Sequence, residues 1–525
     1  MNLRIKQVNS WRAINWPRAE SKVKKLQHKI YKASLENNLS VAHAYQDILL
    51  KSTSAKLLAV RKVTQDKGGK ITAGVDGVKS VDQRRRTQMA RDLKLDGRAS
   101  PIGRVYIPKP GKTEQRPLGI PTLSDRAKQT LAKLALEPQW EARFEPNSYG
   151  FRPGRSCHDA IEAIFKSIYR IPQGKYVLDA DISKCFDTID HDKLLKKLDA
   201  GPKLKRQIHA WLKAGVLESG IVQVSKLGTP QGGVISPLLS NIALHGLENH
   251  LKTWIETQEI RNNHGRKLGK KGKTTGLSVI RYADDFVILH KDHLVILQAK
   301  QEANLWLEQN AGLKLSMTKS RLAHTDKPKN GMIGFEFLGF HIRRYATSRY
   351  GGNKLNTGMK TLIKPSQKSI RKHMDDIERA IQPQLSPEVI INTLTPIVRG
   401  WCNYFKTVTS TETFGKLRNY MFQKLLAWAR SKHPKRGGGY LYKHYFVRGK
   451  SQRQFGIEVL IQGKPETVLL EYHNQKPICR HVKVREHKSP YDGDVGYWGQ
   501  RLRRYAGLNT RVMNLLRLQR GLCKA

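Results

Sequence analysis

The stretch from Ser278 to His290 constrains the fold more than any other part of this sequence. Two runs of β-branched and aromatic residues flank a pair of adjacent acids, Asp284 and Asp285. Such runs are typical of β-strands, and the short Ala-Asp-Asp connection between them predicts a hairpin turn. Neighbouring carboxylates repel each other once they leave water. The turn is therefore either solvated or paired with a cation, and carboxylate oxygens suit Mg²⁺.

The chain carries far more positive than negative charge. Its 525 residues include 95 Lys and Arg against 43 Asp and Glu, a formal net charge of +52. A chain that repels itself this strongly indicates a polyanionic partner, of which nucleic acid is the obvious one. The sequence contains no apolar run of about 18 residues, so no membrane span is predicted. Its length exceeds the roughly 250–300 residues of one core, which indicates several domains.

The cysteines and the N-terminus bear on the cellular compartment. The cysteines, in odd number and without metal-like spacing, are Cys157, Cys185, Cys402, Cys479 and Cys523. This usage is typical of reduced thiols in a cytosol-like compartment. The N-terminus is basic and lacks the apolar core of a signal peptide. We expect a cytoplasmic bacterial protein associated with nucleic acid, with a basic lead-in that contacts RNA; an organellar host stays open.

The N-terminal part predicts helices followed by a basic hairpin. Residues 1–60 keep apolar positions at helical spacing among Lys and Arg. Arg104–Pro121 then shows two extended runs around a Pro-Gly pair, the pattern of a hairpin. Lys109 and Arg116 lie on it, where cations could grip a triphosphate, Arg with paired donors. A solvated basic hairpin explains the same pattern.

A third carboxylate comes from an earlier predicted strand that begins at Tyr176. Alternation along this strand places Asp179 and Asp181 on one face. A carboxylate next to the Asp284–Asp285 turn would complete a site for a pair of Mg²⁺ ions. Metals about 3.5–4 Å apart can activate an attacking 3′-hydroxyl and stabilise a leaving pyrophosphate. The combination therefore favours a metal site over a solvated turn.

Two further segments lie between these strands. Gly228-Thr-Pro-Gln-Gly-Gly leads into a helix that begins near Ser236. Its glycines let the backbone approach a base pair closely, and Gln231 can reach a sugar or a base edge. Arg261–Lys273 is a basic segment that we interpret as a flexible loop, which either contacts RNA phosphates or is simply solvated.

Seven short motifs follow one another along the chain. They are Arg116-Pro-Leu-Gly-Ile-Pro, Phe151-Arg-Pro-Gly, Asp181-Ile-Ser-Lys-Cys-Phe-Asp, Thr229-Pro-Gln-Gly-Gly, Tyr282-Ala-Asp-Asp, Gly312-Leu-Lys-Leu-Ser-Met-Thr-Lys-Ser and Phe335-Glu-Phe-Leu-Gly-Phe. Their order resembles that of reverse transcriptases, and their residues resemble the bacterial group II intron-encoded branch more closely than retroviral or retron enzymes. Ile397-Val-Arg-Gly-Trp-Cys-Asn-Tyr-Phe405 also resembles the maturase, or X, domain that serves as the thumb in this family.

The resemblance implies roles for single residues. The residues that resemble the catalytic metal triad are Asp181, Asp284 and Asp285, with the Ile182 carbonyl as a further ligand of two Mg²⁺ ions, which Mn²⁺ can replace. Phe186 resembles the steric gate that rejects a ribonucleotide 2′-hydroxyl. The nucleotide-binding residues implied are Lys109, Arg116, Phe186, Gln231 and Lys319, with Lys319 also the candidate general acid. The RNA or DNA contacts predicted are Arg152, Arg266, Lys267, Lys270, Lys271, Arg399, Arg436, Arg480 and Arg501.

The implied fold is α+β. It is a right-hand polymerase with fingers and palm of mainly antiparallel sheet plus helices, an α-helical thumb (the maturase X domain) and a small basic C-terminal DNA-binding domain. The predicted regions are an N-terminal helical RNA-binding extension (1–80), fingers and palm (81–355), thumb (356–433) and the basic region (434–525). That last region resembles the entrance to an H-N-H endonuclease module. Cys523 alone cannot make a zinc or nuclease site, so second-strand cleavage is not predicted.

The function implied is that of a group II intron-encoded RNA-directed DNA polymerase. Such a protein would bind its intron RNA, assist splicing as a maturase, and copy the intron into cDNA primed at a cleaved DNA target during retrohoming. Its partners would be intron RNA, target DNA with its primer, and dNTPs, and a homodimer stays open. The alternatives are a splicing factor without activity, an RNA-dependent RNA polymerase and a retron or defence reverse transcriptase. Retention of the acids and Phe186 argues against the first of these.

Overall fold

The chain forms two units, and both combine helices with sheets, as the predicted α+β class requires. The computed structural model describes residues 10–65, 72–108, 115–169, 171–218, 221–223, 227–229, 232–262, 264–329, 331–347, 358–448, 453–461, 464–502 and 515. The first unit comprises Met1–Ala160, Ala180–Arg321 and Val484–Ala525, and the second comprises Ile161–Asp179 and Leu322–Lys483. The chain passes between them within α6 (Cys157–Ile168), β3 (Tyr176–Asp181) and β8 (Arg321–His324).

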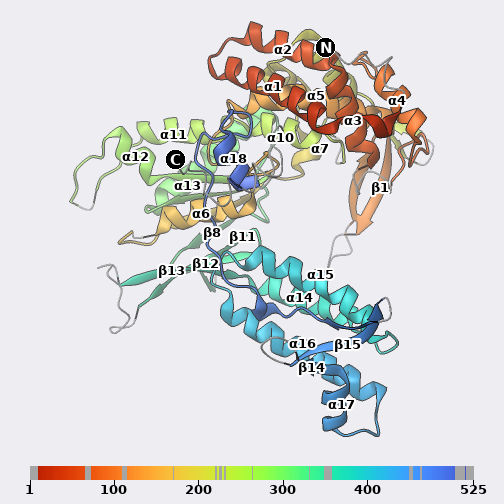
Figure 1. Cartoon of the computed structure of the whole chain (residues 1–525). Coiled ribbons are helices and arrows are strands. Elements are labelled where there is room, and N and C mark those ends of the chain that lie inside the picture. Colours follow the sequence, from red (N-terminus) through yellow and green to blue (C-terminus); the bar gives the residue numbers. More distant parts are fainter. Residues whose placement is uncertain are drawn as a thin grey trace. The chain divides into compact units, whose positions relative to one another are not determined.

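The N-terminal part of the first unit is a group of packed helices (Figure 1). The predicted helical spacing is confirmed here, because the apolar side chains of Val23, Ile30 and Leu131 fill the shared core. Asn15 and Asn38 accept hydrogen bonds from backbone N–H groups at the helix starts, the usual task of an N-cap. These elements are η2 (Trp11–Ala13), α1 (Trp16–Leu35), α2 (Leu39–Lys51), α3 (Thr53–Gln65), α4 (Gln83–Asp92) and α5 (Leu123–Glu141).

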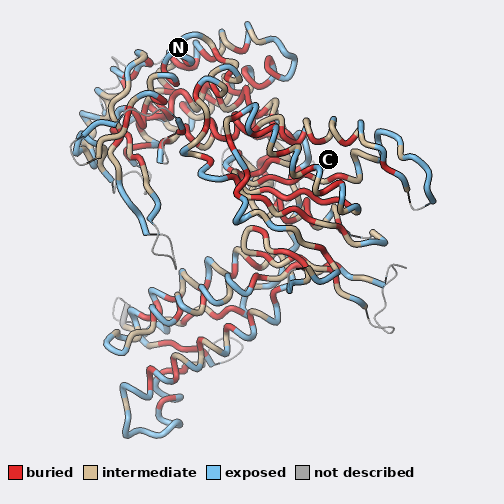
Figure 2. Tube along the Cα trace, turned by 180° about the vertical axis from the view of Figure 1, so that it is seen from behind, coloured by how far each residue is buried: buried red, intermediate tan, exposed pale blue. Residues whose placement is uncertain are grey.

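The remaining helices of the first unit surround its sheets. Buried residues follow the inner helix faces, while exposed residues gather in the connecting loops and along the strands of the basic hairpin (Figure 2). These helices are α7 (Cys185–Thr188), α8 (His191–Lys197), α9 (Pro202–Leu212), α10 (Ser236–Leu244), α11 (Leu247–Thr257), α12 (Lys270–Gly276), α13 (His293–Ala311) and α18 (Val495–Leu502).

Two sheets position the candidate site. In the first, the strand order is β2 (Gln115–Ile120), β1 (Ile102–Pro108), β4 (Val216–Glu218), β5 (Ile221–Gln223). The antiparallel β1–β2 pair confirms the strands of the predicted basic hairpin. In the second sheet, the order is β6 (Ser278–Tyr282), β7 (Asp285–His290), β3, β8. The antiparallel β6–β7 pair confirms the hairpin around the two acids, and β3 is the other neighbour of β7.

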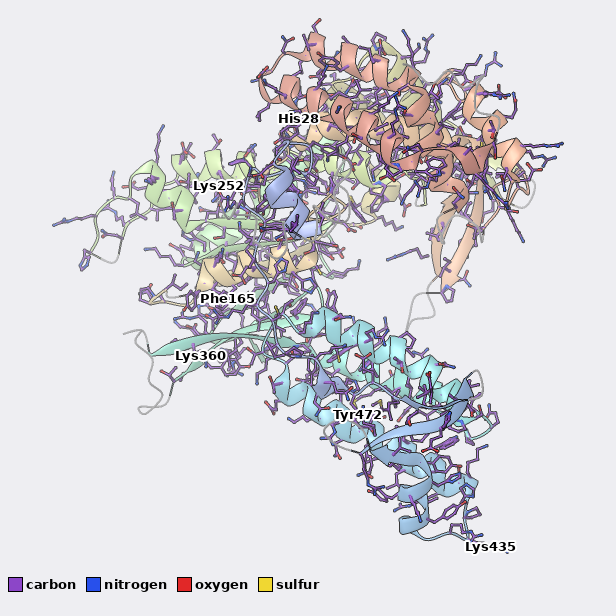
Figure 3. All side chains as sticks on the ribbon, in the orientation of Figure 1. His28, Phe165, Lys252, Lys360, Lys435 and Tyr472 are labelled. Atoms are coloured by element: carbon purple, nitrogen blue, oxygen red, sulfur yellow. The ribbon has the colours of Figure 1, made fainter. Side chains whose placement is uncertain are left out.

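The second unit joins short sheets to long helices. Trp401 and Phe405 of α15 contact each other at 4.5 Å between ring centroids, and Phe405 is buried. Tyr472 is fully buried as well (labelled in Figure 3). The elements are β9 (Pro328–Lys329), β10 (Met332–Ile333), β11 (Phe335–Phe337), β12 (Phe340–Ala346), β13 (Met359–Pro365), α14 (Gln367–Ala380), α15 (Pro387–Phe405), α16 (Thr411–Lys432), α17 (Gly438–Tyr445), β14 (Phe446–Arg448), β15 (Arg453–Ile461), β16 (Lys464–Leu469) and η4 (His473–Gln475).

The segment 484–502 packs into the first unit. The His28 ring on α1 lies 2.8 Å from the Tyr491 carbonyl (His28 is labelled in Figure 3), and the Tyr491 hydroxyl donates to Glu137 at 2.7 Å. The Val484 N–H donates to the buried carboxylate of Asp159 at 2.7 Å. Because these hydrogen bonds join it to the N-terminal helices and α6, the segment differs from the single C-terminal region predicted for 434–525.

Trp498 anchors this segment. Its side chain is fully buried, and a Cβ built on Gly154 would lie 2.4 Å from the indole, so only glycine fits there. Within the described ranges, no helix is both long and apolar enough to cross a membrane.

We predict that Trp498→Ala weakens the docking of 484–502, because removing a buried Trp costs about 3–5 kcal/mol. Hydrogen exchange at the backbone amides of this segment should accelerate accordingly. Val482→Ala, at a side chain that is 77% exposed, is the control and should leave the exchange unchanged. Equal exchange in the wild-type protein and Trp498→Ala would show that the indole does not hold the segment.

Candidate active site

The turn that carries the two acids has an unusual backbone. Tyr282 pairs with Asp285, which leaves Ala283 and Asp284 to form the turn. Ala283 has φ +58°, in the left-handed region that residues other than glycine rarely adopt. Its side chain is buried. Because the local preference of alanine opposes this conformation, the surroundings must impose it.

Asp181 lies within electrostatic reach of this turn. It is the last residue of β3, next to β7 in the sheet. Burial, together with the negative charges of Asp284 and Asp181, raises the pKa of Asp285 to about 6. Burial also raises the pKa of Asp284, and the charge of Asp181 adds to that rise. The fold therefore brings together three acids that are far apart in the sequence.

Two of the predicted nucleotide-binding cations also lie near these acids. The Lys319 ammonium donates to both carboxylate oxygens of Asp181, at 3.0 and 3.2 Å. The positive charges of Lys319 and Arg116 oppose the rise in the pKa of Asp284. Arg116 is an exposed residue of β2, opposite Ile107 in the hairpin. Both positively charged side chains thus lie where they would attract an anion bound to metal ions that the three acids hold.

The chemistry of the donors fits a divalent ion. Carboxylate oxygens suit Mg²⁺, and a cation would offset the burial and the repulsion that together raise the pKa of Asp285. In the described part of the chain, however, no three His, Cys, Asp or Glu side chains converge closely enough to hold an ion. The Lys319 ammonium supplies the positive charge at Asp181 instead. Ile182 follows Asp181 in an isolated bridge with Leu315, and its role as a carbonyl ligand stays a prediction.

The predicted steric gate, Phe186, lies in α7 against a residue that sequence reasoning missed. The Phe151 ring meets it edge to face, with centroids 6.1 Å apart. Phe151 has φ +59°, which is rare for a bulky residue, and its side chain is 49% exposed. Thr229 N–H donates to the Phe186 carbonyl at 2.6 Å, which ties the glycine-rich loop to α7. Lys109 and Gln231 lie outside the described residues.

Arg152 does not agree with its predicted contact with RNA or DNA. Its guanidinium donates to both carboxylate oxygens of Glu141, at 2.8 and 2.9 Å, and also to the backbone carbonyls of Glu145 and Ser148. The side chains of Arg152 and Glu141 are each only 1% exposed. Arg152 is therefore a structural residue, and the Phe-Arg-Pro-Gly motif alone could not reveal its distant partner.

Arg501 is likewise engaged inside the protein. Its guanidinium donates to the fully buried Asp159 at 2.6 Å and to the Gly154 carbonyl at 3.3 Å. These contacts belong to the docking of 484–502, and the nucleic-acid contact of the partly exposed Arg501 stays a prediction.

The other predicted nucleic-acid contacts have exposed positions. Arg266 and Lys271 are exposed, while Lys267 pairs with Glu259 at 2.7 Å and Lys270 with Glu256 at 3.9 Å. The segment differs from the predicted loop, because its end forms α12. In the second unit Arg399 pairs with Glu471 at 2.6 Å and Arg480 is exposed. The Arg436 guanidinium lies 5.2 Å from the Tyr440 ring centroid.

Comparison with known protein families gives three consecutive matches. The family described as "N-terminal domain of reverse transcriptase" matches residues 11–93, and "Reverse transcriptase (RNA-dependent DNA polymerase)" matches residues 107–342. The family described as "Group II intron, maturase-specific domain" matches residues 367–446. The chain thus carries a reverse transcriptase domain followed by a maturase-specific domain.

Similar known proteins indicate which family of reverse transcriptases this chain belongs to. The chain is 35% identical to protein YkfC of Escherichia coli over 56% of this chain and 82% of that protein. It is 30% identical to the group II intron-encoded protein LtrA of Lactococcus lactis, over 63% of this chain and 65% of that protein. Maturase-like protein 1 of Euglena gracilis is 25% identical over 77% of this chain and 79% of that protein. This chain belongs to the family of group II intron-encoded reverse transcriptases and maturases, which confirms the resemblance found in the sequence.

We predict that Arg152→Met lowers the free energy of unfolding by about 3–5 kcal/mol, because it leaves the Glu141 carboxylate buried without a partner. The loss should appear as a lower thermal midpoint, with no change in the salt dependence of RNA binding. Arg266→Met, at an exposed position, should instead keep the midpoint and reduce the salt slope by about 0.7–0.9. A reduced salt slope in Arg152→Met at unchanged stability would contradict the structural role.

Proposed function

We propose that this chain is an RNA-directed DNA polymerase whose active site is built on Asp181, Asp284 and Asp285. The observation that carries the proposal is the placement of Asp181, at the end of β3, beside the Asp284–Asp285 turn. Burial, with the charges of Asp284 and Asp181, raises the pKa of Asp285 there. Membership of the reverse transcriptase family supports the reaction class. Two Mg²⁺ ions bound there would supply activation of the primer 3′-hydroxyl and stabilisation of the leaving pyrophosphate.

The protein's own residues perform the remaining tasks. Arg116 would bind the triphosphate through its paired donors. Lys319 would leave Asp181 for the phosphates when the carboxylate gains another cation, and could then protonate the pyrophosphate. Phe186, packed against Phe151, would exclude a 2′-hydroxyl and so select dNTPs. Lys109 and Gln231 would complete the nucleotide site.

The nucleic acid that we propose as partner is a group II intron RNA. A net charge of +52 and the maturase-specific match support this partner. The contacts would be mostly to phosphates and to RNA shape, since an A-form major groove is too narrow for side chains. We further propose that the protein assists splicing and then copies the intron by target-primed reverse transcription during retrohoming.

The parts of the chain would divide this work. Residues 81–355 would form fingers and palm, and α14, α15 and α16 would form the thumb within 356–433. The N-terminal helices would hold intron RNA. Arg436 and Arg480 would contact DNA from the region that follows the thumb, whereas 484–502 would support the first unit through Trp498.

We predict that Asp284→Asn lowers the rate of primer extension on an RNA template with dNTPs on the order of 10³-fold, equivalent to about 4 kcal/mol of transition-state stabilisation. The measurement is single-turnover extension with Mg²⁺. Asp199→Asn, which removes the carboxylate of the partly buried ion pair with Arg143, is the control and should keep the wild-type rate. Full extension by Asp284→Asn, or preference of the wild-type protein for rNTPs, would remove the proposed activity.

We also predict that the protein accelerates splicing of its intron at an Mg²⁺ concentration where the RNA alone splices slowly. Bound cationic side chains replace ions that the folded RNA otherwise needs. Asp284→Asn should accelerate splicing as well as the wild-type protein does, because RNA binding uses other surfaces. No gain in splicing rate under conditions of saturated RNA binding would remove the maturase role.

A further inference from the structure

The left-handed turn at Ala283 lies against three residues of the first unit that the proposed chemistry does not use. They are a buried guanidinium on strand β6, a buried amide on helix α10 and a glycine backbone in the loop that precedes α6. Together they surround the backbone that presents Asp284 and Asp285.

Arg281 is the first of these residues. It lies on β6 two residues before Ala283, and its side chain is buried. Its Nη1 donates to the Ala283 carbonyl at 3.2 Å and to the Asn241 side-chain oxygen at 3.1 Å. Its backbone is held as well, because Arg281 N–H donates to Asn147 O and Arg281 O accepts from Tyr149 N–H, both at 2.9 Å. Burying a charged guanidinium costs free energy unless hydrogen bonds and nearby charges offset it, which favours a specific role for Arg281.

Asn241 joins Arg281 to the loop before α6. It lies in α10, is 1% exposed, and its side-chain amide donates to the Gly150 carbonyl at 2.8 Å. Its carboxamide oxygen accepts from Arg281. One amide thus donates from its nitrogen and accepts at its oxygen, whereas an ionised carboxylate has no donor and a hydroxyl must do both at a single atom.

Gly150 closes the arrangement from the other side. A Cβ built at this position would lie 2.3 Å from the Ala283 nitrogen and 2.9 Å from the Ala283 Cα. The backbones of the loop and the turn are therefore in direct contact. No larger residue fits at position 150 without displacing the turn.

We infer that Arg281 and Asn241 are positioning residues that hold Ala283 in its left-handed conformation and thereby aim Asp284 and Asp285 for polymerisation. The inference rests on the proposed function. The hydrogen bond from Arg281 satisfies the turn carbonyl, and Asn241 fixes both Arg281 and the Gly150 backbone that presses on the turn. Neither side chain needs to touch the nucleotide, since an error of about 1 Å in the position of catalytic groups can cost on the order of 10²-fold in rate.

The test compares Asn241→Ala with a matched control. Gln207→Ala also removes a buried amide that makes two hydrogen bonds to backbone, to Gly97 N–H and Arg98 O, in α9 of the same unit. We expect Asn241→Ala to lower kcat of primer extension by about 10–100-fold, to raise the Mg²⁺ concentration needed for half-maximal rate, and to leave KM for dNTP within about twofold. Gln207→Ala should lose thermal stability but keep kcat.

A second substitution tests the strain directly. Glycine adopts φ +58° without a steric penalty, so Ala283→Gly lowers the cost that Arg281 and Asn241 offset. The double variant Asn241→Ala/Ala283→Gly should regain part of kcat and of the Mg²⁺ response. Arg281→Lys keeps the charge but is a shorter side chain without the planar guanidinium, and it should resemble Asn241→Ala. Should Asn241→Ala not fold, Arg281→Lys and Asn241→Ser carry the same expectation for kcat.

The outcomes separate this inference from the proposed function. The positioning role would be overturned if Asn241→Ala and Arg281→Lys kept the wild-type kcat, or if Gln207→Ala lowered kcat as much as Asn241→Ala does. Neither result would affect the proposed function as long as Asp284→Asn still abolished primer extension. Full activity of Asp284→Asn would instead overturn the proposed function itself. A fall in kcat that Ala283→Gly does not relieve would show that the two residues act on stability rather than on the turn.

Discussion

The repulsion among three carboxylates is the constraint on which the rest of this structure depends. Burial and the neighbouring negative charges raise the pKa of Asp284 and of Asp285, and the charge of Asp181 contributes to both rises. A bound cation would relieve this repulsion. The surrounding fold opposes the tendency of such groups to move apart. It does so with a short hairpin, a buried guanidinium and a loop backbone packed against the turn.

Arginine serves two different purposes in this strongly basic chain. At the surface it supplies positive charge for a polyanion, as the exposed Arg266 and Arg480 do. In the interior, Arg152 joins Glu141 to the loop before α6, and Arg281 joins β6 to α10. The partly exposed Arg501 pairs with the buried Asp159 from a distant part of the sequence. Net charge alone therefore overstates the number of cations available to nucleic acid.

Local patterns predicted much of the fold and of the candidate site. Apolar residues alternate along β6 and β7 and recur at helical spacing along α1. These patterns depend only on residues close together in the sequence, so they predict strands and a helix without knowledge of the fold. The resemblance of the motifs predicted which acids would meet. It did not predict that Lys319 would form an ion pair with Asp181, or that Phe151 would pack against Phe186, because those contacts join separate elements.

The sequence by itself determined the family, the order of the motifs and the hairpin that carries two acids, since these depend on residues near one another in the chain. Only the tertiary structure decided which basic residues pair inside the protein. Arg152 looks like a surface cation until Glu141 is seen beside it, and the partly exposed Arg501 pairs with the buried Asp159. The physical reason is that the cost of burying a charge depends on a partner supplied by another segment, which no local pattern contains.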